Sequence, residues 1–193
     1  MESSGGVVAL MFTDVVGSTE LLGRLGEDGA EELRRHHFSM LREAVARFGG
    51  QEVKDLGDGL MVVFTSPVDA VGCAIAMQHA VAAYNEEGGP ASGIAIRIGI
   101  HAGEPHRESG DFHGTPVVVA SRLCNTARGG EILAGELVAD LIGSRGGHCF
   151  RSAGTLRLKG IDRPVAAVSV DWRAGAPPGP ATAEPRRTPA PQP

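Results

Sequence analysis

Two carboxylates stand where apolar segments meet turns, and the first is Asp14. It interrupts the run VVALMFTDVVGST, residues 7–19, which closes with Gly17, Ser18 and Thr19. A short run of Val, Leu, Met and Phe predicts a buried strand, where an unpaired carboxylate would be costly. A divalent cation on Asp14 and a phosphate at the start of the next helix would satisfy the charge and the free N–H groups. In the simpler alternative, Asp14 bonds its own turn and Ser18 or Thr19 caps the helix.

The second carboxylate is Asp58, in the segment KDLGDGLMVVF. Asp-Gly is a frequent hairpin dipeptide, so this residue could serve the turn alone. Both acids nevertheless fall where a predicted strand meets a turn. Two carboxylates brought together there could hold a pair of divalent metal ions, since magnesium prefers carboxylate and phosphate oxygens.

Composition limits the class of protein. The 193 residues are 42% apolar and 21% charged, with a formal net charge of −5. These values predict one globular domain with a substantial core and argue against a basic surface that binds nucleic acid. With no long apolar run and no signal-peptide pattern, we expect a cytoplasmic chain without a membrane segment. Cys73, Cys124 and Cys149 lack CxxC spacing, so we expect reduced core thiols and no zinc site.

Hydrophobic periodicity and turn residues predict the elements that must position the two acids. Helices are expected over residues 20–25, 30–48, 66–84, 115–126 and 136–142. Strands are expected in the first run and over residues 52–55, 60–65, 94–103, 132–134, 150–158 and 165–172. The apolar stripe of the helix expected over residues 30–48 is continuous if His37 lies at its edge. Residues 104–114 are expected to form a polar loop, and the mixture of hairpins and helices predicts an α+β fold.

The ends of the chain differ in composition from its middle. Residues 1–6 form a short polar lead, and the last twenty residues are dominated by Pro, Ala and Gly. We therefore predict a folded domain over residues 7–172 and a disordered tail over residues 173–193. Within the domain, only two of the 18 basic residues are lysines, Lys54 and Lys159. An ammonium group in an arginine-rich chain suggests a specific task.

Four motifs in order are FTDVVGST, KxxGDGxxxxF, RIGIHAGE and GDFHGTPVVVASRL. Their order and separation resemble the catalytic domain of the class III adenylyl and guanylyl cyclases, over roughly residues 7–172. The resemblance implies a ferredoxin-like βαββαβ mixed sheet that contains antiparallel strands and is covered by helices. It also implies nucleotide binding.

The resemblance assigns roles around the first acid. Asp14 and Asp58 would hold two Mg²⁺ or Mn²⁺ ions per site, with the carbonyl oxygen of Val15 as a further ligand. The turn formed by Gly17, Ser18 and Thr19 would face the phosphates of the substrate.

A second set of roles falls on later residues. Lys54 and Asp111 would read the nucleotide base, Arg122 would stabilise the transition state, and Lys159 would reach the triphosphate. Val118 stands where the family usually has an asparagine that orients the ribose. Valine offers no hydrogen bond, so this departure puts the rate of reaction in doubt more than its type.

Hydrogen-bonding capacity gives the base preference. Adenine presents an acceptor at N1 beside an amino donor, whereas guanine presents an N1–H donor beside a carbonyl acceptor. A lysine only donates and an ionised aspartate only accepts, so Lys54 with Asp111 complements adenine and mismatches guanine.

The resulting hypothesis is an adenylyl cyclase that converts ATP to 3′,5′-cyclic AMP and pyrophosphate. As the resemblance implies, two copies of the chain would pack head to tail as a homodimer with sites shared between them. Two alternatives remain at this stage: a catalytically weak or silent module that binds ATP, and a guanylyl cyclase. The regulator is unknown, because no sensor pattern accompanies the domain.

Overall fold

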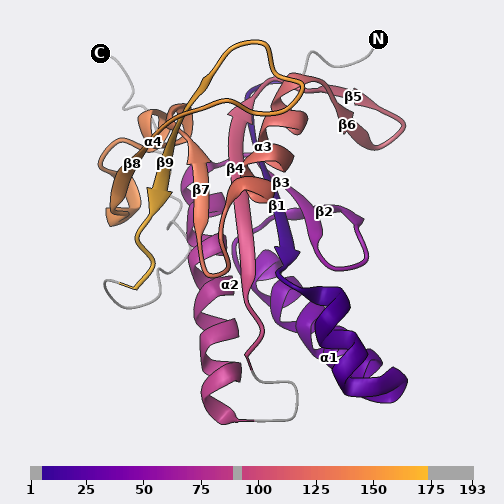
Figure 1. Ribbon diagram of the computed structural model, residues 1–193. Coiled ribbons are helices and arrows are strands. Elements are labelled where there is room, and N and C mark those ends of the chain that lie inside the picture. The colour runs from indigo at the N-terminus through magenta and orange to yellow at the C-terminus, as the bar shows by residue number, and fades with distance from the viewer. Residues whose placement is uncertain (1–5, 89–92, 174–193) are drawn as a thin grey trace, which may run out of the picture.

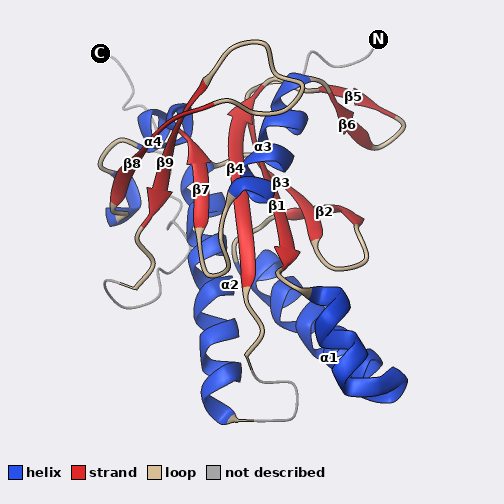
Figure 2. Cartoon of the chain, viewed as in Figure 1, coloured by secondary structure: helices blue, strands red, loops and turns tan. Residues whose placement is uncertain are grey.

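A seven-stranded mixed sheet forms the centre of the computed structural model, which describes residues 6–88 and 93–173 (Figures 1 and 2). Its strands are β1 (Val8–Val15), β2 (Gln51–Asp55), β3 (Leu60–Phe64), β4 (Ile96–Gly103), β7 (Ile132–Gly135), β8 (Phe150–Leu156) and β9 (Val165–Val170). The strand order is β2-β3-β1-β4-β7-β9-β8, and β4 pairs with β7 in parallel while the other neighbours are antiparallel. The first four strands in chain order, with the two helices between them, give the expected ferredoxin-like unit.

Helices cover both faces of this sheet. They are α1 (Ser18–Arg47), α2 (Pro67–Glu87), α3 (Thr115–Thr126) and α4 (Glu136–Ile142), with a 3-10 turn at Arg145–Gly147. Helices α1, α2 and α4 contribute to one core cluster, whereas α3 packs into two clusters on the opposite face. No helix within the described ranges is long and apolar enough to cross a membrane.

Successive side chains of β1 point to opposite faces of the sheet, so this one strand contributes to the core on both faces. Ala9 and Met11 lie in the cluster beneath α1 and α2, while Leu10 and Phe12 lie in the cluster beneath α3. All four side chains are buried. Because the run is apolar on both faces, it suits a central strand and no other position in the sheet.

Three local features differ from expectation. Residues 104–114 contain a separate hairpin of β5 (His106–Glu108) and β6 (Asp111–His113) instead of a loop. The break predicted between the two helices before residue 48 is present but is confined to Gly26, where φ is 70° and ψ is 177°, so both helices fall within α1. Cys149 is exposed, although Cys73 and Cys124 are buried thiols as expected. Most of the predicted tail lies outside the described residues.

Close packing between α3 and β4 depends on Gly99. A Cβ atom added there would lie 2.1 Å from the backbone nitrogen of Cys124 and 2.4 Å from the carbonyl oxygen of Ala120. Backbone atoms cannot rotate away as a side chain can, so α3 would have to move. The position of α3 on the sheet is therefore set by a residue without a side chain.

We expect Gly99→Ala to lower the free energy of unfolding by about 1–3 kcal/mol, because it overpacks this contact. The control is Gly23→Ala in α1, where an added Cβ meets nothing within 4 Å, and where alanine should stabilise the helix by about 0.5–1 kcal/mol. Urea unfolding followed by circular dichroism measures both. Equal midpoints for the two variants would contradict the packing argument.

Candidate active site

The sheet brings Asp14 and Asp58 together at one end of β1. Asp14 is the penultimate residue of β1, and Asp58 lies in the hairpin between β2 and β3. The N–H of Leu60 donates to the Thr13 hydroxyl oxygen at 2.9 Å, and Gly59 packs against the Thr13 carbonyl. These contacts hold the hairpin against the end of β1. Burial, followed by the nearby charge of Asp14, raises the pKa of Asp58 above its ordinary value, as expected for two carboxylates in one site.

The turn after Asp14 is built differently from a capped helix. Gly17 precedes the first helical residue in the left-handed conformation, with φ 70° and ψ 27°, and no side chain caps the helix. The Ser18 hydroxyl instead donates to a carboxylate oxygen of Asp58 at 3.2 Å. The capping alternative is therefore wrong for Ser18, and the side chain of Thr19 lies outside the described ones.

Arg97 supplies the positive charge that Asp14 requires, and sequence reasoning missed it. The residue lies directly opposite Asp14 in the pairing of β1 with β4. Its Nε donates to the Asp14 carboxylate at 2.6 Å, its Nη2 lies 2.5 Å from the same oxygen, and its Nη1 donates to the Asn125 carbonyl at 3.0 Å. The Asp14 side chain is 19% exposed and that of Arg97 28%. The alternative in which Asp14 bonds its own turn is thus replaced by a cross-strand ion pair.

A pocket of about 420 Å³ opens over these residues. It is lined by Asp14, Val15, Gly17, Ser18, Asp58, Arg97 and Asn125. Nowhere in the described part of the chain do three or more His, Cys, Asp or Glu side chains gather as a metal cluster. Two carboxylates and a main-chain carbonyl form an all-oxygen set, which fits Mg²⁺ or Mn²⁺ that completes its coordination with substrate phosphates and water.

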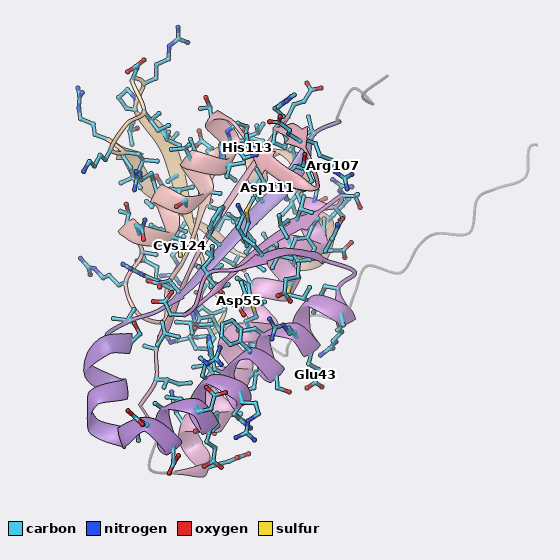
Figure 3. All side chains as sticks on the ribbon, turned by 90° about the vertical axis from the view of Figure 1, so that its right-hand side faces the viewer. Glu43, Asp55, Arg107, Asp111, His113 and Cys124 are labelled. Atoms are coloured by element: carbon cyan, nitrogen blue, oxygen red, sulfur yellow. The ribbon has the colours of Figure 1, made fainter. Side chains whose placement is uncertain are left out.

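Lys54 on β2 and Asp111 on β6 form an ion pair. The Lys54 ammonium donates to Asp111 Oδ2 at 2.6 Å, and the other oxygen of Asp111 accepts from the Phe112 N–H at 2.7 Å. The bond from Lys54 lowers the pKa of Asp111 below its ordinary value, so the carboxylate is ionised at neutral pH. Figure 3 shows Asp111 with His113 and Arg107 on the β5–β6 hairpin.

Helix α3 carries a third set of predicted site residues. Val118 and Arg122 lie four residues apart, so they share one face of the helix, and Val118 is an exposed apolar side chain. The Nε of Arg122 donates to the carbonyl oxygen of Lys159 at 3.1 Å. Across the described ranges, no hydrogen bond or ion pair connects Asp14 or Asp58 with Lys54, Asp111 or Arg122.

The sequence of residues 2–168 matches the family model of the adenylate and guanylate cyclase catalytic domain. The chain belongs to this family. A putative adenylate cyclase from Rhizobium meliloti is 31% identical over 186 residues, which is 95% of this chain and 32% of that protein. A serine/threonine-protein kinase from Myxococcus xanthus is 28% identical over 89% of this chain and 20% of its own length. This cyclase domain therefore spans a third or less of these two relatives.

Solved structures agree with the cyclase fold. The adenylyl cyclase CyaB from P. aeruginosa superposes with a TM-score of 0.75 at 26% identity, over 86% of this chain and 93% of that one. Adenylate cyclases from Trypanosoma brucei, solved in their monomeric state, give a TM-score of 0.78 at 24% identity, over 91% of this chain and 94% of theirs. The four sequence motifs thus identified both the family and the α+β sheet correctly.

His37 is a second residue beside the site that sequence reasoning did not single out for chemistry. Its side chain is 3% exposed, and burial lowers its pKa to about 4, partly offset by the backbone and charge of Asp58. Neither ring nitrogen has a hydrogen-bonding partner among the described residues. Its position in the helical stripe gave the only signal, because a histidine among apolar positions of a helix is often merely packed.

We expect Asp58→Asn to raise the unfolding temperature of the domain at neutral pH in metal-free buffer. Because the folded-state pKa of Asp58 is raised, the folded protein prefers the protonated acid. The penalty for the ionised form is absent well below pH 3.8 and fully present above the folded-state pKa. The gain from the substitution should therefore disappear as the pH is lowered.

Differential scanning calorimetry with chelator at several pH values measures this gain. Asp140→Asn, at an exposed carboxylate on α4, controls for the loss of one negative charge. A lower unfolding temperature for Asp58→Asn at neutral pH would contradict the carboxylate repulsion.

Proposed function

We propose that this domain is an adenylyl cyclase that converts ATP to 3′,5′-cyclic AMP and pyrophosphate at sites shared by two copies of the chain. The observation that carries the proposal is the ion pair of Lys54 with Asp111, which presents a donor and an acceptor suited to adenine. The pocket over Asp14 and Asp58 supports the phosphoryl chemistry. The adenylyl cyclase among the structural neighbours supports the same reading.

Asp14, Asp58 and the carbonyl oxygen of Val15 are the residues that would hold two Mg²⁺ or Mn²⁺ ions. When bound, such ions lower the pKa of the ribose 3′-hydroxyl and neutralise charge on the leaving pyrophosphate. In the reaction, the 3′-oxygen forms a bond to the α-phosphorus, the bond from that phosphorus to the oxygen that bridges the α- and β-phosphates breaks, pyrophosphate leaves with that oxygen and its bonding electrons, and the hydroxyl proton passes to water.

The chain's own residues prepare this site for phosphate. Arg97 holds one oxygen of Asp14 through Nε and Nη2, and a guanidinium can exchange a carboxylate for phosphate oxygens. The turn at Gly17 leaves the first N–H groups of α1 without side-chain caps, which suits an anion.

Arg122 and Lys159 supply further positive charge. The planar guanidinium of Arg122 suits the charge that develops on the α-phosphoryl oxygens, and Lys159, held beside it, would reach the triphosphate. Val118 provides no hydrogen bond to the ribose. One missing contact, at about 1–3 kcal/mol, would slow turnover roughly ten- to a hundredfold.

Two copies of the chain explain why the functional groups lie apart. Within the described part of one chain, no hydrogen bond or ion pair joins the proposed metal ligands to Lys54, Asp111 or Arg122. A head-to-tail pair would bring the first group of one subunit to the second group of its partner, and a two-fold axis would generate two equivalent sites. The competing possibility, a silent module that binds ATP, rests on Val118, whereas the retained charges favour catalysis.

The direct test is incubation of the purified protein with Mn²⁺ and either ATP or GTP, followed by detection of the cyclic product. Cyclic AMP from ATP supports the proposal. Binding of ATP without product would favour the silent module, and cyclic GMP as the main product would favour guanylyl cyclase activity.

We expect kcat/KM for ATP to exceed that for GTP by more than about a hundredfold, because a mismatched base leaves polar groups unpaired. Changing Lys54→Glu together with Asp111→Cys should reduce this ratio at least about tenfold. Arg42→Gln, which breaks an exposed ion pair with Glu52 next to the same strand, is the matched control. Equal use of ATP and GTP by the unmodified protein would refute the base assignment.

We expect Asp14→Ala and Arg122→Ala to be inactive as separate homodimers but to complement each other when mixed. With free exchange, about half of the dimers contain one of each subunit, and each of these has one site with both substitutions and one with neither. Activity should return to about a quarter of the wild-type value per subunit. Co-expression followed by a cyclic AMP assay measures it, and inactive heterodimers would exclude the shared site.

A further inference from the structure

The turn that carries Asp58 is held at two points, one on each side of that residue. On the C-terminal side, the Leu60 N–H donates to the Thr13 hydroxyl oxygen at 2.9 Å. On the N-terminal side, the Gly57 N–H donates to Asp55 Oδ1 at 2.8 Å. Because Asp58 lies between these two bonds, both of them limit the directions in which its carboxylate can point.

The second oxygen of Asp55 is bound from α1. Arg42 Nη2 donates to Asp55 Oδ2 at 3.1 Å, and Arg42 also donates to both carboxylate oxygens of Glu52 at 2.8 Å. The guanidinium of Arg42 lies 4.9 Å from the centre of the buried Phe38 ring, a cation–π contact that further restricts its position. Asp55 therefore lies between α1 and the turn, with one oxygen for each of them (Figure 3).

A β-bulge in β2 makes this arrangement possible. The pairing of β2 with β3 shifts register after Glu52, so β2 contains one extra residue at that point. Glu52 and Asp55 are both paired with β3 residues that belong to the core cluster beneath α1 and α2. Side chains three positions apart in a regular strand face opposite sides of the sheet. The bulge therefore lets Arg42 bind both acids from α1.

Asp171, directly after β9, has the same two kinds of contact at another place in the fold. Its Oδ1 accepts from the Arg173 N–H at 3.3 Å, and its Oδ2 accepts from Arg151 Nη2 at 2.8 Å. It lines a pocket of about 310 Å³ whose lining includes none of the candidate metal ligands. Asp171 is thus a matched control for Asp55.

We propose that Asp55 is a positioning residue for the metal site, which holds the N-terminal half of the Asp58 turn through the Gly57 N–H while Arg42 holds Asp55. This keeps the Asp58 carboxylate directed into the pocket that it shares with Asp14. The proposal rests on the proposed function, because it takes Asp58 as a metal ligand. Partners that orient a metal ligand directly contribute roughly 10–100-fold to metal affinity or activity. Asp55 acts through the backbone next to the ligand, so a smaller effect is expected.

The test compares two substitutions that remove the same negative charge. Asp55→Ala removes the acceptor of the Gly57 N–H, whereas Asp55→Asn keeps an oxygen that can accept it, since asparagine forms this local turn as aspartate does. Asp171→Ala is the control for the loss of an acid, a turn bond and an arginine partner. Mn²⁺ binding is measured without turnover, by the electron paramagnetic resonance signal of free Mn²⁺, and thermal unfolding is recorded for each protein.

We expect Asp55→Ala to weaken Mn²⁺ binding about three- to tenfold, which is below the range for a direct partner of the ligand. Asp55→Asn should keep most of the wild-type affinity, and Asp171→Ala should bind as the wild type does. In turnover assays, the Mn²⁺ concentration for half-maximal rate should rise for Asp55→Ala, while the ratio of ATP to GTP use stays unchanged. If Asp55→Ala does not fold, Asp55→Val replaces it, because valine suits a strand and also lacks an acceptor.

Four results would overturn the proposal. The first is equal Mn²⁺ affinity in the wild type and Asp55→Ala. The second is equal weakening in Asp55→Ala and Asp55→Asn, which would assign the effect to charge. The third is equal weakening in Asp55→Ala and Asp171→Ala, which would assign it to a general loss of stability. The fourth is absence of Mn²⁺ binding by the wild type, which would also remove the metal assignment of Asp14 and Asp58. The first three leave that assignment intact, so the two failures are distinguishable.

Discussion

The placement of a carboxylate at the end of a buried central strand is the constraint on which the rest of this structure depends. β1 is apolar on both faces, so Asp14 needs a cation that arrives from an adjacent strand. The antiparallel register of β1 with β4 sets Arg97 directly opposite. A slip of one residue would turn Asp14 to the other face and separate the pair. The register of β1 with β3 likewise sets the hairpin that carries Asp58. One sheet register therefore positions both acids and their arginine.

Sequence reasoning succeeded where a signal was local or belonged to a long motif. The apolar run with Asp14, the Asp-Gly hairpin and the four motifs in order predicted the sheet, the family and the meeting of Lys54 with Asp111, 57 residues apart.

Sequence reasoning failed where the position of a side chain depended on pairing between strands. The sequence contains Arg97 in RIGIHAGE, but only the register of β4 shows which residue it faces. The β5–β6 hairpin escaped notice because its strands have three residues each and only Phe112 is buried. The hydrogen bond from Ser18 to Asp58 was not foreseen, because the two residues lie 40 positions apart in the chain.

The distribution of charge explains why one subunit is an incomplete unit in the proposed reaction. Asp14 and Asp58 repel each other and are partly neutralised by Arg97, whereas Lys54 and Asp111 neutralise each other. Arg97 thus pairs with Asp14, and Lys54 with Asp111, within one chain and without the nucleotide. Substrate would replace these internal partners with phosphate and base. The ion pairs of Arg97 with Asp14 and of Lys54 with Asp111 can therefore form in the empty protein, and their members would exchange partners when the substrate binds.

The ion pair between Asp14 and Arg97 also has a consequence for folding during synthesis on the ribosome. Asp14 and Arg97 are 83 residues apart in the chain, and at about 5–20 residues per second Arg97 is synthesised roughly 4–17 seconds after Asp14. During that interval β1 can pair with β3 but has no partner along its other edge, and Asp14 has no arginine. Non-local pairings of this kind form slowly, and an unpaired apolar strand edge attracts other chains. The nascent polypeptide is therefore most exposed to aggregation before β4 emerges, and chaperones would act on it in that interval.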